Sequence, residues 1–279
     1  MTYYQLKITI EPFEPWSEIL TAYLGELYFE GFYEKENILY AFVAKEHFEE
    51  KEFLRIIKSI QDNVSIDYSF SELPQQNWNA AWESNFQPVF IQNELAILAP
   101  FHEIENTFKR KIIIEPKMSF GTGHHQTTYM TCEAIMKADL KGKQVLDMGS
   151  GTGVLAILAE LEGALDVLAV DIEPWSVENC ARNASDNKCR NISSILGDID
   201  AVSPKTFDVI FANINKNILL CHLPDYVLAM NQNGLLYLSG FFASDAHELN
   251  QAAVSLGLCF SHKEEREGWC MLVFKKINE

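Results

Sequence analysis

The sequence predicts an α/β protein of two parts, a small α+β domain over residues 1–72 and a larger domain over residues 93–279. Two observations predict the larger domain. Strand and helix patterns alternate along it, which is typical of a mostly parallel, doubly wound sheet with helices on both faces. A glycine loop, "DMGSGTG", also lies between a buried strand and a helix, where such sheets bind ligands. The third observation is the β-α-β-β-α-β order of the first seventy residues, a ferredoxin-like pattern.

Hydrophobic periodicity defines the elements of the small domain. A helix over residues 16–31 shows helical spacing and should end at Gly31, because glycine commonly follows the last helical residue. A second, amphipathic helix over residues 47–61 places Phe48, Phe53 and Ile57 on or near one stripe, with Ile56 and Ile60 beside them. The expected strands cover residues 3–10, 31–36, 37–44 and 64–70.

Residues 73–92 are predicted to form a linker, because two prolines and a polar cluster interrupt the pattern. Trp78 and Trp82 are four residues apart and would lie on one face of a short helix. We expect this helix to dock onto a domain, since aromatic residues at helical spacing usually serve packing. A direct role of the two tryptophans in ligand binding is the alternative.

The larger domain continues the alternation to its end. Patterns typical of strands begin at residues 88–100 and 110–116, and the last two strands, 258–264 and 269–276, should form a terminal β-hairpin. Between them, apolar strands are expected over residues 143–149, 165–172, 192–199, 207–214 and 234–241. Helices are expected over residues 129–140, 153–163, 173–187, 216–230 and 244–257.

The chain carries a net charge of −17, and both of its parts are acidic. Residues 1–70 hold 6 Lys and Arg against 13 Asp and Glu, and residues 71–279 hold 16 against 26. Binding to a nucleic-acid backbone depends on cations that neutralise phosphates, so we expect no direct grip on nucleic acid. An acidic surface favours a cationic partner, although it also serves solubility alone.

The sequence predicts a cytoplasmic protein with no membrane segment. Its apolar runs are too short to span a bilayer, and its N-terminus lacks the features of a secretory signal. The six cysteines are scattered and match no zinc-binding spacing, which is typical of reduced thiols in the cytosol.

The glycine loop is the first candidate site. Gly149, Gly151 and Gly153 allow a sharp turn and let the backbone approach a ligand closely. Asp171 ends the next strand, where a carboxylate accepts hydrogen bonds from ribose hydroxyls. Because "GTGVLA" also fits Gly-x-Gly-x-x-Ala, a dinucleotide remains an alternative ligand. A purely structural turn is the other alternative.

Three further polar residues favour S-adenosylmethionine, which has a sulfonium cation and no phosphate. Asp147 in the glycine motif suits an ammonium or other cation better than a pyrophosphate, which binds at helix N-termini. Asp198 ends the third strand, where it could meet the adenine edge or cap a turn. Asn213 ends the fourth strand, where its amide oxygen could accept a hydrogen bond from an incoming amine; a turn-forming role is the alternative.

Asp147 with the three glycines, Asp171 and Asn213 resemble class I S-adenosylmethionine-dependent methyltransferases. With "SFGTGHHQTT", "FANI", "SGF" and "NWNAAWESNFQP", most of the chain resembles the PrmA family, which methylates large-subunit ribosomal protein eleven. The sequence departs from the usual family pattern at His124 and Gln126, where threonine and proline are common.

The resemblance implies a site and a substrate. Thr128 should contact S-adenosylmethionine together with Gly149, Asp171 and Asn213, and Asn213 should act in catalysis by orienting the amine. The turn of Phe120, Gly121, Thr122 and Gly123 should enclose the methionine end of the cofactor. The amine would belong to lysine side chains or to the α-amino group of a large-subunit ribosomal protein, which the small domain would recognise. No metal is expected, since adjacent histidines on a turn rarely converge on one ion.

Three other functions stay open at this point. They are a methyltransferase that acts on RNA or a small molecule, a nicotinamide-dependent oxidoreductase, and a binding module without catalysis.

Overall fold

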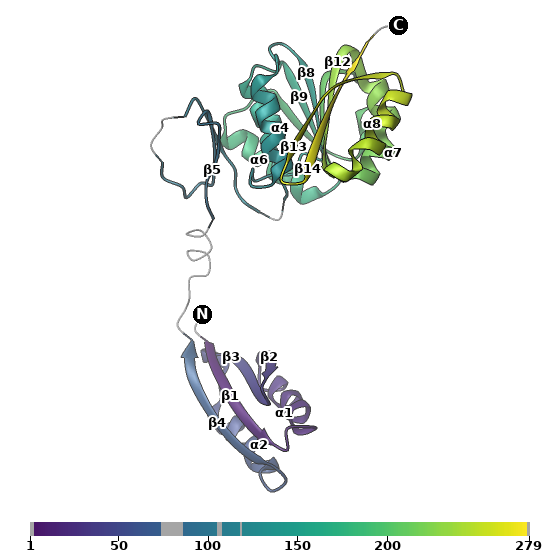
Figure 1. Cartoon of the computed structure of the whole chain (residues 1–279). Helices are drawn as coiled ribbons and strands as arrows, with labels where there is room; N and C mark the ends of the chain where they lie inside the picture. Colours follow the sequence, from purple (N-terminus) through teal and green to yellow (C-terminus); the bar gives the residue numbers. More distant parts are fainter. Residues whose placement is uncertain (1–2, 74–85, 105–107, 118, 278–279) are drawn as a thin grey trace. The chain divides into compact units, whose positions relative to one another are not determined.

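The computed structural model describes residues 3–73, 86–104, 108–117 and 119–277. The chain divides into two compact units, a small one of Met1–Phe86 and a large one of Gln87–Glu279 (Figure 1). None of the described helices is long and apolar enough to cross a membrane. Trp78 and Trp82, with most of the predicted linker, lie outside the described residues.

The small unit is a four-stranded antiparallel sheet with two helices, in the predicted β-α-β-β-α-β order. The strand order across the sheet is β2-β3-β1-β4, as expected for a ferredoxin-like fold. Its elements are β1 (Tyr3–Glu11), α1 (Trp16–Gly25), β2 (Phe29–Lys35), β3 (Ile38–Ala44), the 3₁₀ helix η1 (Lys45–His47), α2 (Glu50–Ile60) and β4 (Ser65–Leu73).

Helix α1 is shorter than predicted, because it ends at Gly25 rather than Gly31. The N–H of Leu27 donates to the Leu24 carbonyl in a closing turn, and Tyr28 adopts a left-handed backbone with φ of 63°. Buried Phe29 then begins strand β2, so the apolar residues after Gly25 belong to the sheet. Helix α2 likewise begins later than predicted, at Glu50, because Glu49 before it has an extended backbone.

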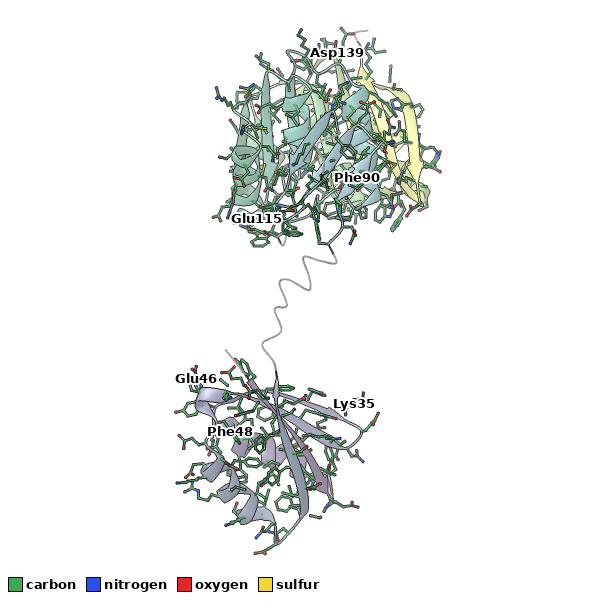
Figure 2. The ribbon with its side chains drawn as sticks, turned by 90° about the vertical axis from the view of Figure 1, so that its left-hand side faces the viewer. Lys35, Glu46, Phe48, Phe90, Glu115 and Asp139 are labelled. Carbon is green, nitrogen blue, oxygen red and sulfur yellow. The ribbon has the colours of Figure 1, made fainter. Side chains whose placement is uncertain are left out.

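The two faces of the small sheet differ in their side chains. Leu39, Ala41 and Val43 face a core shared with the helices. Phe48, which is labelled in Figure 2, is partly buried against that core and packs edge-on against Tyr4. The alternating residues of β3 point to the opposite face. There Tyr33 stacks on Tyr40 with 4.5 Å between ring centroids, and on Phe42 at 5.9 Å.

The large unit contains a seven-stranded sheet in the order β10-β9-β8-β11-β12-β14-β13. Strand β14 pairs antiparallel with both neighbours and the other pairs are parallel, which confirms the doubly wound sheet and its terminal hairpin. The elements that form and connect it are α4 (Gln126–Lys137), β8 (Gln144–Met148), α5 (Val154–Leu161), β9 (Asp166–Asp171), α6 (Pro174–Asp186), β10 (Ile192–Leu196), η2 (Ile199–Val202), β11 (Phe207–Asn213), α7 (Lys216–Ala229), β12 (Met230–Phe242), η3 (Ala243–Asp245), α8 (Ala246–Ser255), β13 (Leu258–Arg266) and β14 (Trp269–Lys276).

A separate three-stranded sheet precedes this domain, in the order β5-β6-β7. It consists of β5 (Val89–Ile91), β6 (Leu95–Leu98) and β7 (Arg110–Ile113). One prediction needs correction here. The patterns at residues 88–100 and 110–116 form this separate sheet instead of starting the main one. The reason is packing, because Val89, Ile97 and Ile112 bury their side chains in the same core as α4 and α5.

Helices cover both faces of the main sheet (Figure 1). Residues of α4, α5 and α6 share one core with the sheet, and residues of α7 and α8 share the other. Central strands such as β11 are therefore almost continuously apolar. Their carboxyl ends stop at the same edge, where the two glycine loops, Asp171 and Asn213 meet.

Candidate active site

A cavity of about 540 Å³ opens at the carboxyl ends of the parallel strands. Half of the predicted site residues line it, namely Phe120, Gly149, Gly151, Asp171, Asp198 and Asn213. The other half lie outside its wall, namely Gly121, Thr122, Gly123, Thr128, Asp147 and Gly153.

The two glycine loops are joined at the carbonyl oxygen of Phe120. This oxygen accepts the N–H of Thr152 at 2.8 Å, and the Thr152 hydroxyl donates to the Gly121 carbonyl at 2.5 Å. Gly151 has φ of +53°, and a Cβ there would lie only 2.1 Å from the Phe120 oxygen. Gly151 is therefore required for the upstream loop, residues 119–123, to approach the loop of residues 149–153. Gly121 helps to hold these two loops together, because its carbonyl accepts the Thr152 hydroxyl.

Two other glycines allow close packing around the loop. A Cβ on Gly149 would lie 2.2 Å from the Ile214 side chain, and one on Gly153 would lie 2.5 Å from the Cys180 sulfur. Gly149 thus keeps the loop close to the residue after Asn213, whereas Gly153 fits the loop onto α6.

Asp171 orients the glycine loop and also faces the cavity. Its Oδ2 accepts the N–H of Gly151 at 2.8 Å, and its Oδ1 accepts the N–H of Glu173 at 3.0 Å. Each carboxylate oxygen can accept a further bond, so ribose hydroxyls can be held as well. Asp198 combines the two roles considered for it, since it lines the cavity and its Oδ1 accepts the N–H of Asp200 at the start of η2.

Asp147 lies beneath the loop, so our expectation that it faces the ligand needs correction. It is fully buried, and its Oδ2 accepts the N–H of Ala156 at 3.1 Å in the first turn of α5. Its Oδ1 has no hydrogen-bond partner among the described residues. Burial raises the pKa of this carboxyl to about 7.

Asn213 is held from both ends of its amide. Its Oδ1 accepts the hydroxyl of Ser239 at 3.0 Å, and its Nδ2 donates to the hydroxyl of Thr128 at 3.4 Å. Thr128 is fully buried and sits behind Asn213, where it supports the amide instead of lining the cavity. The Oδ1 of Asn213 keeps a second acceptor position for a ligand in the cavity.

The two adjacent histidines have different partners. The His124 ring lies 3.0 Å from the Thr122 hydroxyl and 2.9 Å from the Gln87 carbonyl. The His125 side chain caps α4, because its Nδ1 accepts the N–H of Thr127 at 3.3 Å. Burial lowers the pKa of His125. A neutral ring whose Nδ1 accepts this bond carries its proton on Nε2.

Gln126 joins the start of α4 to the turn of the terminal hairpin. Its Oε1 accepts a bond from the Nε of Arg266 at 2.5 Å, and its Nε2 donates to the Glu267 carboxylate at 2.7 Å. The Arg266 guanidinium also lies 3.8 Å from the centre of the Tyr129 ring. A proline at this position could form neither side-chain bond.

Sequence reasoning missed several residues of the cavity wall. Ile172 and Glu173 directly follow Asp171, so their position next to the ribose acid could have identified them. His125 and Trp269 lie far apart in the sequence, and no spacing pattern connects them. The other missed residues are Thr127, Met148, Val170, Trp175, Ser176, Gly197, Ile214, Asn215, Ile218, His222 and Gly240.

The charges of the cavity fit a cationic ligand. Asp171, Glu173 and Asp198 line it, and no lysine or arginine is found among the described residues of its wall. A glycine cradle with ribose acids and no phosphate-binding cation suits the adenosine and sulfonium of S-adenosylmethionine. It suits the pyrophosphate of a nicotinamide dinucleotide less well.

Replacing Gly151 with alanine tests the contact between the loops. We expect Gly151→Ala to weaken S-adenosylmethionine binding at least about tenfold, because the new Cβ would displace the Phe120 carbonyl and the loop with it. Gly142→Ala is the matched control, since Gly142 also has a positive φ of +71° but an open surrounding. Calorimetric titration would show the difference. Equal affinities in both variants would contradict the role of this contact.

Replacing Asp147 with asparagine tests its burial. The raised pKa means that the folded state becomes less stable as pH rises from about 4 to 7, because Asp147 ionises at a lower pH in the unfolded chain than in the folded one. Asp147→Asn keeps an acceptor for Ala156 and removes this cost, so we expect it to be more stable than the wild type by up to about 4 kcal/mol at pH 8. At pH 4 the difference should nearly vanish. Urea unfolding at both pH values measures the difference in the free energy of unfolding. If the wild type became more stable relative to the variant as pH rises, the raised pKa of Asp147 would be refuted.

Comparison with known proteins shows which family the chain is similar to. Residues 20–277 match the family model described as ribosomal protein L11 methyltransferase (PrmA). The chain is 39% identical to the ribosomal protein L11 methyltransferase of Phocaeicola vulgatus over 98% of this chain and 99% of that protein. The corresponding protein of Bacteroides thetaiotaomicron is 37% identical, with the same coverage.

A solved structure supports the same family. The ribosomal protein L11 methylase of Lactobacillus delbrueckii subsp. bulgaricus aligns with a TM-score of 0.65 and 29% identity, over 69% of this chain and all of that one. The protein is thus a methyltransferase whose cofactor is S-adenosylmethionine, as the resemblance implied. The glycine cradle, the ribose acid and the supported Asn213 all lie within the matched residues, and the chain belongs to the ribosomal protein L11 methyltransferase family.

Proposed function

We propose that the protein transfers methyl groups from S-adenosylmethionine to lysine side chains and the α-amino group of ribosomal protein L11. The relatives are named for that substrate, and the acidic chain suits a cationic partner. One observation carries the assignment to amines. Asn213 presents an amide oxygen to the cavity, and its orientation is held by Ser239 and Thr128.

The chain's own residues would bind the cofactor and orient the amine. Asp171 would hold the ribose, and the glycine loop with Phe120 would enclose the rest of the cofactor, which supplies a methyl group already activated for in-line displacement. Asn213 Oδ1 would accept one N–H of the amine, so that the nitrogen lone pair points toward the methyl group. A further expectation is that the amine loses its proton to water before it reacts.

No dedicated strong base is needed in this mechanism. A free lysine has a pKa of about 10.4, and desolvation in a closed site lowers it. His125 is poorly placed to act as a base, because its Nδ1 is used to cap α4 and its Nε2 then carries the proton. Asp171 and Asp198 come from the ends of β9 and β10, on the other side of β8 from Asn213 at the end of β11, and both accept backbone N–H groups.

We further propose that residues 1–72 form the substrate-recognition domain, residues 73–92 the linker, and residues 93–279 the catalytic domain. Two features of the small unit support recognition of a basic protein. Its first seventy residues carry about twice as many acidic as basic side chains. One face of its sheet also presents the stacked rings of Tyr33, Tyr40 and Phe42. Aromatic faces attract lysine and arginine.

We also propose that the protein acts in the cytoplasm. Its six cysteines are unpaired, which is typical of reduced thiols in that compartment.

A methylation assay tests the substrate and Asn213 together. The protein is incubated with S-adenosylmethionine and either purified L11 or ribosomal RNA, and products are weighed by mass spectrometry. We expect whole methyl increments on L11 only, and a rate about 100-fold lower for Asn213→Ala when S-adenosylmethionine is saturating. Asn191→Ala, at an exposed position, is the control. Transfer to RNA alone would overturn the substrate, and a carboxylate or histidine variant that abolishes transfer without weakening cofactor binding would overturn the mechanism.

Deleting residues 1–70 tests the division of labour. We expect the shortened protein to bind S-adenosylmethionine with unchanged affinity, because the described cavity residues all lie in the large unit. Methylation of L11 should fall below detection in the same mass assay. Equal loss of cofactor binding and methylation would contradict separate roles for the two units.

A further inference from the structure

Helix α6 turns a row of amide side chains toward the protein interior. Asn179 and Asn183 are 2% and 0% exposed, and Asn187, directly after the helix, is partly buried. The three residues follow one another at intervals of four, so they lie on one face of the helix. Buried amides need hydrogen-bond partners, and these partners show what the face holds. We call Asn179, Asn183 and Asn187 the asparagine ladder.

The asparagine ladder covers the free edge of strand β7. This strand is the outer one of the three-stranded sheet, and its other edge pairs with β6. Asn187 Oδ1 accepts the N–H of Ile113 at 2.8 Å, and its Nδ2 donates to the Ile113 carbonyl at 2.6 Å. Two residues further on, Asn183 Oδ1 accepts the N–H of Glu115 at 2.9 Å, and Asn179 Nδ2 lies 3.5 Å from the Glu115 carbonyl.

The spacing of the ladder explains how a helix can take the place of a neighbouring strand. Four residues of an α-helix rise about 6.0 Å, and two residues of a strand rise about 6.6–6.8 Å. Because Ile113 and Glu115 are two residues apart, they present their backbone groups to the same edge. Amides four residues apart on α6 therefore reach them in turn, and they hold the chain beyond the end of β7 on its way to the loop of residues 119–123.

Asn183 is the residue at which the ladder reaches the glycine loop. Its Nδ2 donates to the carbonyl oxygen of Thr152 at 2.8 Å, while the N–H of the same Thr152 donates to the Phe120 carbonyl. One buried side chain thus holds both the chain at Glu115 and the loop of residues 149–153. Asn183 is not among the described residues that line the cavity.

We propose that Asn183 is a positioning residue for S-adenosylmethionine, because it holds the glycine loop in its binding conformation from outside the cavity wall. Without Asn183, the Thr152 carbonyl loses its buried partner, and the empty protein populates other arrangements of the loop. The apparent affinity for a ligand falls in proportion to the fraction of protein whose site is competent to bind it. The proposal depends on the cofactor alone, whatever group receives the methyl.

Two alanine variants separate positioning from stability. Asn183→Ala removes the bonds to Glu115 and Thr152, whereas Asn187→Ala removes the side-chain bonds to Ile113 and to the Asn183 carbonyl. Both should unfold at lower urea concentration, because each leaves backbone groups at the edge of β7 without partners. In calorimetric titration we expect S-adenosylhomocysteine to bind Asn183→Ala at least about tenfold more weakly, and Asn187→Ala within about twofold of the wild type.

Hydrogen–deuterium exchange gives a readout that a loss of stability alone would not move. Residues 149–153 should exchange faster in ligand-free Asn183→Ala than in ligand-free Asn187→Ala, and saturating S-adenosylhomocysteine should restore the protection of the wild type. Cooperative urea unfolding verifies that each variant is folded, and Asn183→Ser replaces Asn183→Ala if it is not. Affinity within about twofold of the wild type in the folded Asn183 variant overturns the proposal. An equal loss of affinity in Asn187→Ala overturns it as well, because the ladder would then act through overall stability.

Discussion

The carbonyl oxygen of Phe120 is the point on which the rest of the site depends. It accepts the N–H of Thr152, and it occupies the space that any side chain on Gly151 would need. The glycine loop of residues 149–153 and the upstream loop of residues 119–123 are therefore positioned together. This contact also fixes the start of α4 a few residues later, and with it His125 at the cap and Thr128 behind Asn213.

The strand order of the sheet determines what each part of the cavity can bind. Carboxylates at the ends of β9 and β10 are oriented by backbone N–H groups, so they present fixed acceptors to the polar part of a cofactor. The ends of β11, β12 and β14 instead provide one oriented amide and a set of aromatic rings. Because a doubly wound sheet brings these ends to one edge, two unlike ligands can meet there.

Local sequence was enough to predict the parts of the site that depend on a strand and the loop after it. The places of Gly151, Asp171 and Asn213 in the cavity wall follow from their positions at or just after the ends of apolar strands. The main sheet and its hairpin were predicted for the same reason, since each element shows its own hydrophobic period. Resemblance, in turn, drew attention to Phe120 and Thr128.

Tertiary contacts decided the features that the sequence could not show. Asp147 was expected to face the ligand, but packing of α5 onto the loop buries it. The pairing of His125 with Trp269 joins residues more than 140 positions apart through the register of β14, which no local pattern encodes. Helix α1 ends early because Tyr28 adopts a left-handed turn, and the three-stranded sheet forms because its apolar residues are buried against α4 and α5.

Hydrogen–deuterium exchange during titration with S-adenosylhomocysteine tests most directly whether the two loops act as one unit. Residues 119–123 and 149–153 would be followed as separate peptides. The account predicts that both gain protection together, with the same midpoint, because the bond from Thr152 to Phe120 joins them. Protection of residues 149–153 without any change at residues 119–123 would contradict it.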